Sequence, residues 1–132
     1  MMHVDALDHL VLTVSSIERT CEFYEQVLGM KQVTFGDGRK AVAFGSQKIN
    51  LHLAGHEFTP RAQHPVPGSA DVCFITSRPL DDCMAHVEAQ GVEIIEGPVD
   101  RTGATSRLRS FYFRDPDLNL IEVANRVAAA PT

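Results

Sequence analysis

The chain has 132 residues, of which 44% are hydrophobic and 22% are charged, and its formal net charge is -5. This length and composition fit one compact domain with a substantial core. The sequence has no basic stripe and no run of Lys or Arg, so nucleic acid is not expected as a partner. No apolar run approaches the roughly 20 residues that a membrane-spanning helix needs, so a membrane is not expected either.

The cysteines give no sign of a disulfide framework or a thiolate metal site. There are three of them, Cys21, Cys73 and Cys83, and no CxxC pair occurs. The N-terminus lacks the charged and apolar regions of a secretory signal. We therefore expect reduced thiols in a cytoplasmic protein.

The first half of the chain predicts four strands and one helix. Residues 7–14 are apolar and β-branched, as is typical of a strand. Ser15 and Ser16 can cap a helix that continues to Leu28, and Gly29 suits the position after the helix. Further strands are expected at residues 30–35, 39–44 and 48–54. The element order is therefore β-α-β-β-β.

The second half repeats this order after a proline-rich connector at residues 55–69. A strand and a helix are expected first, at residues 71–76 and 80–90. Three strands follow, at residues 92–96, 108–114 and 118–124, and residues 97–107 are predicted to form a loop. Residues 1–132 are thus one domain. It comprises a first βαβββ module at 7–54, a second at 70–125 and a tail at 126–132.

Four polar residues interrupt the apolar strands at two equivalent places. Overlaying the modules pairs His9 with Asp71 early in the first strands, and His52 with Glu122 in the last strands. Strand alternation puts each of them opposite the apolar face. Each residue alone could be a solvated or hydrogen-bonded side chain. Together, imidazoles and carboxylates are typical ligands of a divalent first-row metal, so the pattern predicts a metal site.

The same residues give the chain a resemblance to the vicinal oxygen chelate superfamily, which includes glyoxalase I, extradiol dioxygenases and bleomycin-resistance proteins. The resemblance covers essentially the whole chain. Within the superfamily it is strongest to the glyoxalase domain-containing protein 5 group and its bacterial relatives, often labelled virulence proteins. The motifs that carry it are FGSQKINLH at 44–52, HPVPGS at 64–69, EGPVDRTGA at 96–104 and FRDPDLNLIE at 113–122.

This resemblance implies an α+β fold, in which the two βαβββ modules form a curled, eight-stranded half-barrel around one divalent metal ion. The implied ligands are His9, His52, Asp71 and Glu122. The metal would be Ni, Zn, Mn or Fe. A small-molecule substrate and a homodimer are implied as well.

The implied activity is that of a glyoxalase-like lyase or isomerase, similar to lactoylglutathione lyase. The substrate would bind the metal through vicinal oxygens, and Glu122 would move a proton while the metal stabilises the enediolate. Arg101, Arg107 and Arg109, around the predicted loop of the second module, could hold a substrate carboxylate. A solvated loop is the simpler interpretation of these three residues.

Two other functions stay open. One is an Fe(II) extradiol-type dioxygenase, but such enzymes generally have a histidine at the place of Asp71. They also have an acid–base histidine ahead of the pair Phe111 and Tyr112, where this sequence has none. The other is a resistance protein that binds a small molecule without catalysis.

Overall fold

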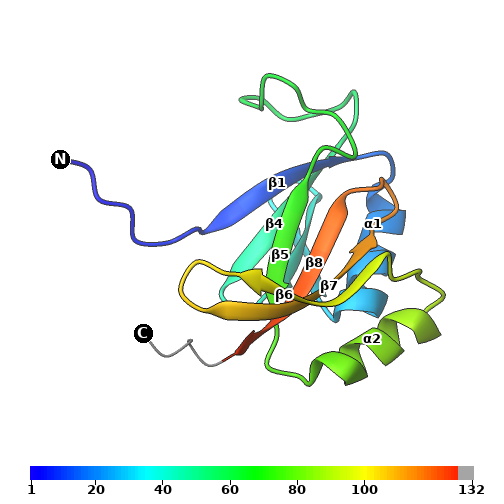
Figure 1. Cartoon of the computed structure of the whole chain (residues 1–132). Coiled ribbons are helices and arrows are strands. Elements are labelled where there is room, and N and C mark those ends of the chain that lie inside the picture. The colour runs from blue at the N-terminus through cyan, green and yellow to red at the C-terminus, as the bar shows by residue number, and fades with distance from the viewer. Residues whose placement is uncertain (128–132) are drawn as a thin grey trace. The chain divides into compact units, whose positions relative to one another are not determined.

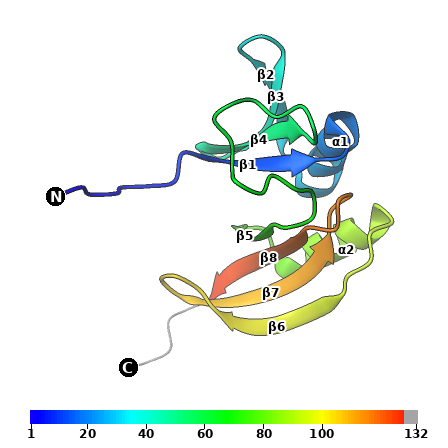
Figure 2. The same ribbon diagram turned by 90° about the horizontal axis from the view of Figure 1, so that it is seen from above.

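The structure is a computed structural model that describes residues 1–127 (Figure 1). The chain divides into two compact units, Met1–Gly68 and the part from Ser69 onward. Each unit has a four-stranded sheet and one helix in the order β-α-β-β-β (Figure 2). The predicted α+β class and its eight strands in two βαβββ modules are therefore confirmed. The predicted tail lies largely outside the described residues, at 128–132.

The first unit contains one helix and one mixed sheet. Its strands are β1 (His9–Val14), β2 (Lys31–Phe35), β3 (Arg39–Phe44) and β4 (Gln47–Leu53), and its helix is α1 (Ile17–Leu28). The strand order is β1-β4-β3-β2. Strand β1 runs parallel to β4, because α1 carries the chain back across the sheet, while the remaining pairs are antiparallel.

Helix α1 begins and ends as its sequence predicts. Ser16 Oγ accepts a hydrogen bond from the backbone N–H of Arg19 at 3.2 Å. Gly29 closes the helix with φ 68°, a conformation that glycine adopts without strain. The helix buries Tyr24 and Val27. The buried sheet residues on the apolar face are Leu12, Val14, Val42, Ile49 and Leu51.

The second unit has the same sheet order. Its strands are β5 (Asp71–Ile75), β6 (Glu96–Thr102), β7 (Arg107–Arg114) and β8 (Leu120–Val127), and its helix is α2 (Leu80–Ala89). The order is β5-β8-β7-β6, with β5 parallel to β8. Phe111 and Phe113 of β7 stack with ring centroids 5.8 Å apart and are fully buried. They share a core with Leu80 and Val87 of α2, as well as Ile121 of β8.

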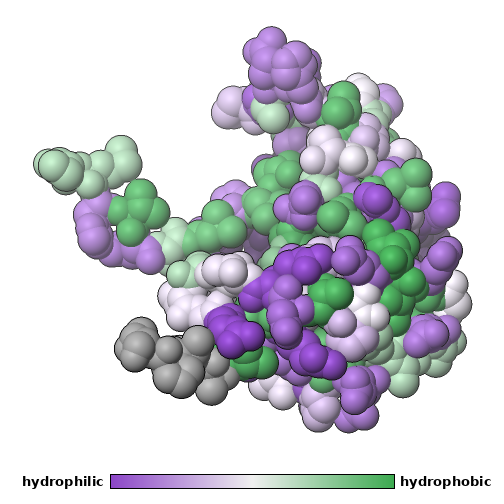
Figure 3. Space-filling view, viewed as in Figure 1, coloured by the Kyte–Doolittle hydropathy of each residue, from purple (hydrophilic) through white to green (hydrophobic). Residues whose placement is uncertain are grey.

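Strand β6 corrects the sequence prediction. Residues 92–95 of the strand predicted at 92–96 are not a strand, and β6 instead begins at Glu96 and takes in residues 97–102 of the loop predicted at 97–107. Pro98 cannot donate to a ladder, but β6 is an edge strand and the register shifts between Glu96 and Val99. The exposed side of β6 is hydrophilic (Figure 3), so it lacks the apolar alternation by which strands are found. A Cβ added at Gly97 would lie 2.6 Å from Phe111 Cβ, so the strand passes too close to β7 for any larger residue.

The turn between β7 and β8 is held by a buried carboxylate. Asp115, which is 3% exposed, accepts hydrogen bonds at Oδ1 from the backbone N–H groups of Asp117 and Asn119. Its Oδ2 accepts from Asn119 Nδ2 at 2.8 Å. Asn119 Oδ1 in turn accepts from the backbone N–H of Ala70, just before β5. Strand β8 begins at Leu120 and continues to Val127, three residues beyond its predicted end.

No helix among residues 1–127 is long and apolar enough to cross a membrane.

Candidate functional site

The sheet of the first unit has a polar face opposite its apolar core. Register and alternation place His9 and Thr13 of β1 on the same face as Lys48, Asn50 and His52 of β4. Antiparallel pairing adds Arg39 and Ala41 of β3 to this face, and Phe35 of β2. We refer to these eight residues as the first polar face.

The two predicted histidine ligands lie at different heights on this face. His9 pairs with Lys48, whereas His52 pairs with Thr13, four residues further along β1. At about 3.3 Å per residue, the offset along the strands is roughly 13 Å. His9 is exposed, and its Nδ1 lies 2.8 Å from Asp8 Oδ1. The structure therefore does not bring His9 and His52 side by side.

His52 is buried, with 4% of its surface exposed, and it has its own partners. Its ring packs edge-on against Phe58, with centroids 5.3 Å apart, and its Nε2 lies 3.4 Å from Arg39 Nη2. A guanidinium can only donate, so Nε2 accepts and the ring proton is on Nδ1. Burial lowers the pKa of His52, and the charge of Arg39 lowers it further, while Glu57 opposes this. The Nε2 lone pair thus points at a cation, an arrangement that disfavours the predicted role as a metal ligand.

Strand pairing identifies a different counterpart of Glu122. In the second unit, Glu122 lies two positions beyond the β8 partner of Asp71. In the first unit, the residue two positions beyond the β4 partner of His9 is Asn50. The predicted overlay of His52 on Glu122 is therefore wrong by two residues. A slip of two preserves the face of every side chain, so the hydrophobic pattern does not detect it.

Asn50 has a buried side-chain oxygen that is available to a metal ion or a ligand. It is 6% exposed, and its Oδ1 has no hydrogen-bond partner among residues 1–127. An unsatisfied buried acceptor costs about 1–3 kcal/mol, so this oxygen is suited to a cation or an incoming hydrogen-bond donor. Sequence reasoning did not single out Asn50, although an overlay by strand register would have found it.

Glu122 lies half-buried in the second unit and is surrounded by neutral groups. Its Oε2 accepts a hydrogen bond from Ser110 Oγ at 2.6 Å, and Ser110 is fully buried. Its register partners are Cys73 on β5 and Tyr112 on β7. Within the described part of the chain, Glu122 takes part in no salt bridge. The contacts of its carboxylate are thus with neutral groups, and within residues 1–127 no Lys or Arg forms a salt bridge with it.

The surroundings of Glu122 show the effect of this charge. Desolvation and the Glu122 carboxylate together raise the pKa of the Cys73 thiol to about 11. Burial raises the pKa of Tyr112 too, and Glu122 adds to that effect. Asp71 is exposed and lies on the same face as Cys73, one pleat earlier on β5. A cavity of about 370 Å³ opens here, lined by Cys73, Arg101, Ser106, Leu108, Glu122 and Arg126 among others.

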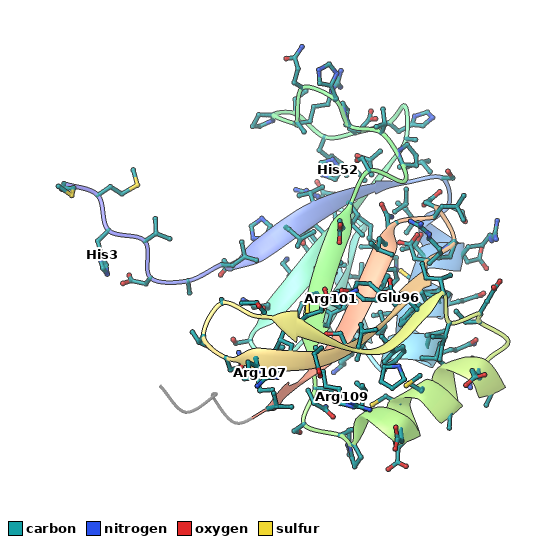
Figure 4. The ribbon with its side chains drawn as sticks, in the orientation of Figure 1. His3, His52, Glu96, Arg101, Arg107 and Arg109 are labelled. Carbon is teal, nitrogen blue, oxygen red and sulfur yellow. The ribbon has the colours of Figure 1, made fainter. Side chains whose placement is uncertain are left out.

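Of the three predicted substrate-binding arginines, Arg101 lies on the Glu122 side of the sheet. It lines the cavity from β6, and its Nε donates to Tyr112 Oη at 2.9 Å. Its Nη2 lies 3.2 Å from Glu96 Oε1, and the two side chains lie together in Figure 4. These bonds join a cation and a carboxylate of β6 to a phenol of β7.

Arg107 and Arg109 lie elsewhere. Both alternate with Ser110 and Tyr112 on β7, so they occupy the face that carries the Phe111 core rather than Glu122 (Figure 4). Neither lines the cavity. The structure therefore separates them from Glu122 and Arg101, and gives them no shared site.

No three His, Cys, Asp or Glu side chains within residues 1–127 lie close enough together to hold a metal ion. Each unit by itself offers two candidate donors, His9 and Asn50 in the first, Asp71 and Glu122 in the second. Imidazole nitrogen and amide or carboxylate oxygens suit divalent first-row metals. The unpartnered Oδ1 of Asn50 and the uncompensated charge of Glu122 therefore fit a cation.

Comparison with known proteins gives consistent matches along the chain. Residues 6–123 match the family described as Glyoxalase/Bleomycin resistance protein/Dioxygenase superfamily. Virulence protein STM3117 of Salmonella typhimurium is 56% identical over 96% of this chain and 88% of its own length, and its crystal structure superposes with a TM-score of 0.94. An integron cassette protein from the mobile metagenome of V. cholerae is 62% identical, with a TM-score of 0.93 over 95% of this chain and 98% of its own.

A more distant structure shows the fold alone. Lactoylglutathione lyase from Agrobacterium tumefaciens is 21% identical, with a TM-score of 0.71 over 92% of this chain and 94% of that one.

Proposed function

Because the chain belongs to the Glyoxalase/Bleomycin resistance protein/Dioxygenase superfamily, we propose that it is a divalent-metal-dependent, glyoxalase-like lyase or isomerase. Its substrate would be a small molecule that binds the metal through two vicinal oxygens, as the substrate of a lactoylglutathione lyase does. The observation that carries the proposal is the half-buried Glu122 carboxylate, which lines a cavity and is held there by the neutral hydroxyl of Ser110.

Glu122 would act as the base. A carboxylate without a counter-charge can take a proton from a carbon next to a carbonyl and return it to the neighbouring carbon. Ser110 holds Oε2 through a short hydrogen bond and so fixes the orientation of the group during this transfer. Tyr112, held in turn by Arg101 Nε, can donate to a substrate oxygen or to Glu122 itself.

We propose His9, Asp71 and Glu122 as metal ligands, with Asn50 as the fourth donor and His52 as the alternative at that place. The ion, Ni, Zn, Mn or Fe, would act as a Lewis acid on the two substrate oxygens. The support for Asn50 is its buried, unpartnered Oδ1, whereas His52 Nε2 already accepts from Arg39.

The metal set can be tested by elemental analysis of protein purified without chelators. Glu122→Gln and Asn50→Ala should each lower bound metal at least tenfold, about 1.4 kcal/mol of binding free energy. His52→Ala should leave the metal content unchanged. Glu88→Gln, which removes an exposed carboxylate from α2, is the matched control. Loss of metal from His52→Ala with retention in Asn50→Ala would reverse the assignment.

The reaction needs its own test. Turnover of the methylglyoxal–glutathione adduct is measured with each of the four metals, before and after Glu122→Gln. Oxygen uptake with catechols after anaerobic iron loading tests the dioxygenase alternative, which Asp71 disfavours because ring-cleaving relatives generally have histidine there. A protein that binds no metal and turns over neither substrate would be a small-molecule-binding protein without catalysis.

We also propose that the protein is a homodimer that works in the cytoplasm. Light scattering coupled to gel filtration measures the first property directly. A mass of one chain, 14.5 kDa, would contradict it.

A further inference from the structure

We infer that the first polar face carries an anion site, built by Arg39 and Lys48, that binds a carboxylate or phosphate group of the ligand. The inference rests on the proposed function in one respect, since it describes the substrate of that same enzyme as an anion. The site itself is formed by residues of the first unit, and the proposed base Glu122 is no part of it.

Arg39 is the central residue of this site. Its guanidinium lies 4.3 Å from the Phe58 ring centroid and 5.1 Å from that of Phe35. Its Nε is buried and has no hydrogen-bond partner among the described residues. Its Nη2 lies 3.4 Å from the neutral His52 ring, the one polar contact that its side chain makes within residues 1–127. The aromatic faces attract the cation but do not accept hydrogen bonds in the plane of the guanidinium. Arg39 therefore has N–H groups available to bind a ligand.

Lys48 brings a second positive charge to the same place. Its Nζ lies 3.6 Å from the Phe35 ring centroid. Arg39 Cζ and Lys48 Nζ are therefore at most 8.7 Å apart, the sum of 5.1 Å and 3.6 Å. Two like charges at this distance repel one another, and an anion between or beside them would offset that repulsion.

The described residues supply no such anion. No carboxylate forms a salt bridge with Arg39 or Lys48 in residues 1–127. Two acidic residues are the nearest in the chain, Asp37 in the turn before Arg39 and Glu57 on the connector. Glu57 Oε1 accepts from the backbone N–H of Gly55 at 3.0 Å, and Glu57 also interacts with Arg61 and His52. Within residues 1–127, neither Arg39 nor Lys48 thus has a salt-bridge partner.

A small organic anion fits this arrangement. Arg39 can offer a planar N–H edge and Lys48 a mobile ammonium, the two kinds of donor that proteins use for carboxylate and phosphate oxygens. The same unit has a cavity of about 450 Å³, lined by Val11 and Thr13 of β1 and by Pro60, Arg61, Ala62 and Pro65. Thr13 is the register partner of His52, which contacts Arg39. Phe35 and Phe58 would cover the apolar part of the ligand.

The site can be tested without metal or turnover. Protein labelled with ¹⁵N is freed of metal on a chelating resin, which is then removed, and is titrated with glycolate or inorganic phosphate while the Nε–Hε signal of Arg39 is followed by NMR. We expect a saturable shift at millimolar anion. Glycolate binding alone would identify a carboxylate site, and phosphate binding alone a phosphate site.

Two variants and a matched control complete the test. Arg39→Gln should abolish binding, and Lys48→Gln should weaken it about tenfold. Lys40→Gln removes an equal charge from the opposite face of the same strand, where Lys40 Nζ bonds Thr34 Oγ1, and should leave binding unchanged. If Arg39→Gln does not fold, the Lys48→Gln titration and the wild-type Nε signal still decide.

Two results would overturn the inference. One is the absence of a saturable shift with either anion, and the other is equal loss of affinity in Lys48→Gln and Lys40→Gln. Because the protein is free of metal throughout, neither result bears on the metal ligands or on Glu122. Conversely, a protein that binds the anion but has no lyase activity would contradict the proposed function and would still support the anion site.

Discussion

Ser110 and Glu122 are joined across the β7–β8 pair by a hydrogen bond in which Oγ and Oε2 are 2.6 Å apart. They are diagonal neighbours, since Glu122 pairs with Tyr112 and Ser110 with Ala124. Ser110 is fully buried, so its hydroxyl has no access to water as an alternative partner. The bond therefore fixes the carboxylate orientation in the folded protein.

Ser110→Ala should lower the free energy of unfolding by about 1–2 kcal/mol, because a hydrogen bond to a charged group is lost. Urea denaturation measures this loss. Ser106→Ala is the matched control, since Ser106 Oγ is buried and has no hydrogen-bond partner in the described residues. Removal of the Ser106 hydroxyl should leave the free energy of unfolding unchanged or raise it slightly. Equal losses in the two variants would show that the Ser110 bond contributes nothing.

Cys73 should react slowly with iodoacetamide at pH 8. Its pKa of about 11 means that the reactive thiolate is a small fraction of the thiol, on the order of one part in a thousand. Raising the pH should increase the rate until the pH passes this pKa. Glu122→Gln removes the carboxylate that helps to raise the pKa, so alkylation of Cys73 at pH 8 should become faster. Site-resolved mass spectrometry follows Cys73, with Cys83 as the internal reference, and an unchanged Cys73 rate would contradict the contact.

Asp115→Ala should be among the most destabilising changes in the second unit, with a loss of about 2–4 kcal/mol. The buried carboxylate accepts three hydrogen bonds, and its removal leaves those donors without a partner. Thermal and urea unfolding measure the loss. Asp100→Ala, at an exposed position of β6, should change stability by less than about 0.5 kcal/mol.

His52 should titrate below the usual histidine pKa of 6.5 in metal-free protein. The sign follows from its surroundings, because both burial and the Arg39 charge disfavour the imidazolium. Below pH 6.5, His52 of the unfolded chain therefore takes up a proton more readily than His52 of the folded protein. The free energy of unfolding falls as the pH drops through this range. Arg39→Gln should raise the His52 pKa, yet leave it below 6.5 because the ring stays buried. NMR of the His52 ring protons tests this, and a normal midpoint in the wild type would contradict it.

The sequence was a good guide to the elements with strong local signals. Ser16 and Gly29 delimit α1 within one residue, because capping is a property of a few neighbouring atoms. Strand β3 was predicted with its observed bounds, since its ends coincide with glycine turns. Strand β6 was missed. Its sequence is mostly polar and contains Pro98, and only pairing with β7 makes it a strand.

The candidate site was predicted less completely, for a reason of geometry. Glu122 stood out because a carboxylate is unexpected among Leu120, Ile121 and Val123. Asn50 and His52 share a face, so nothing local distinguishes which of them corresponds to Glu122; the partner strand β1 does. The cluster around Arg39 needed the positions of Phe58 and Lys48, which come from outside its strand.

The parallel pairs have a consequence for synthesis on the ribosome. Strand β5 is at the edge of its sheet, and its one neighbour is β8, the last strand of the unit. The hydrogen bond from Ala70 to Asn119 joins residues 49 positions apart. During translation, β5 must therefore wait with its backbone unpaired until β8 has left the exit tunnel, while β1 meets β4 much earlier. We therefore expect the backbone of β5 to be open to mispairing until β8 is synthesised, the stage at which the Asp115 turn can also form.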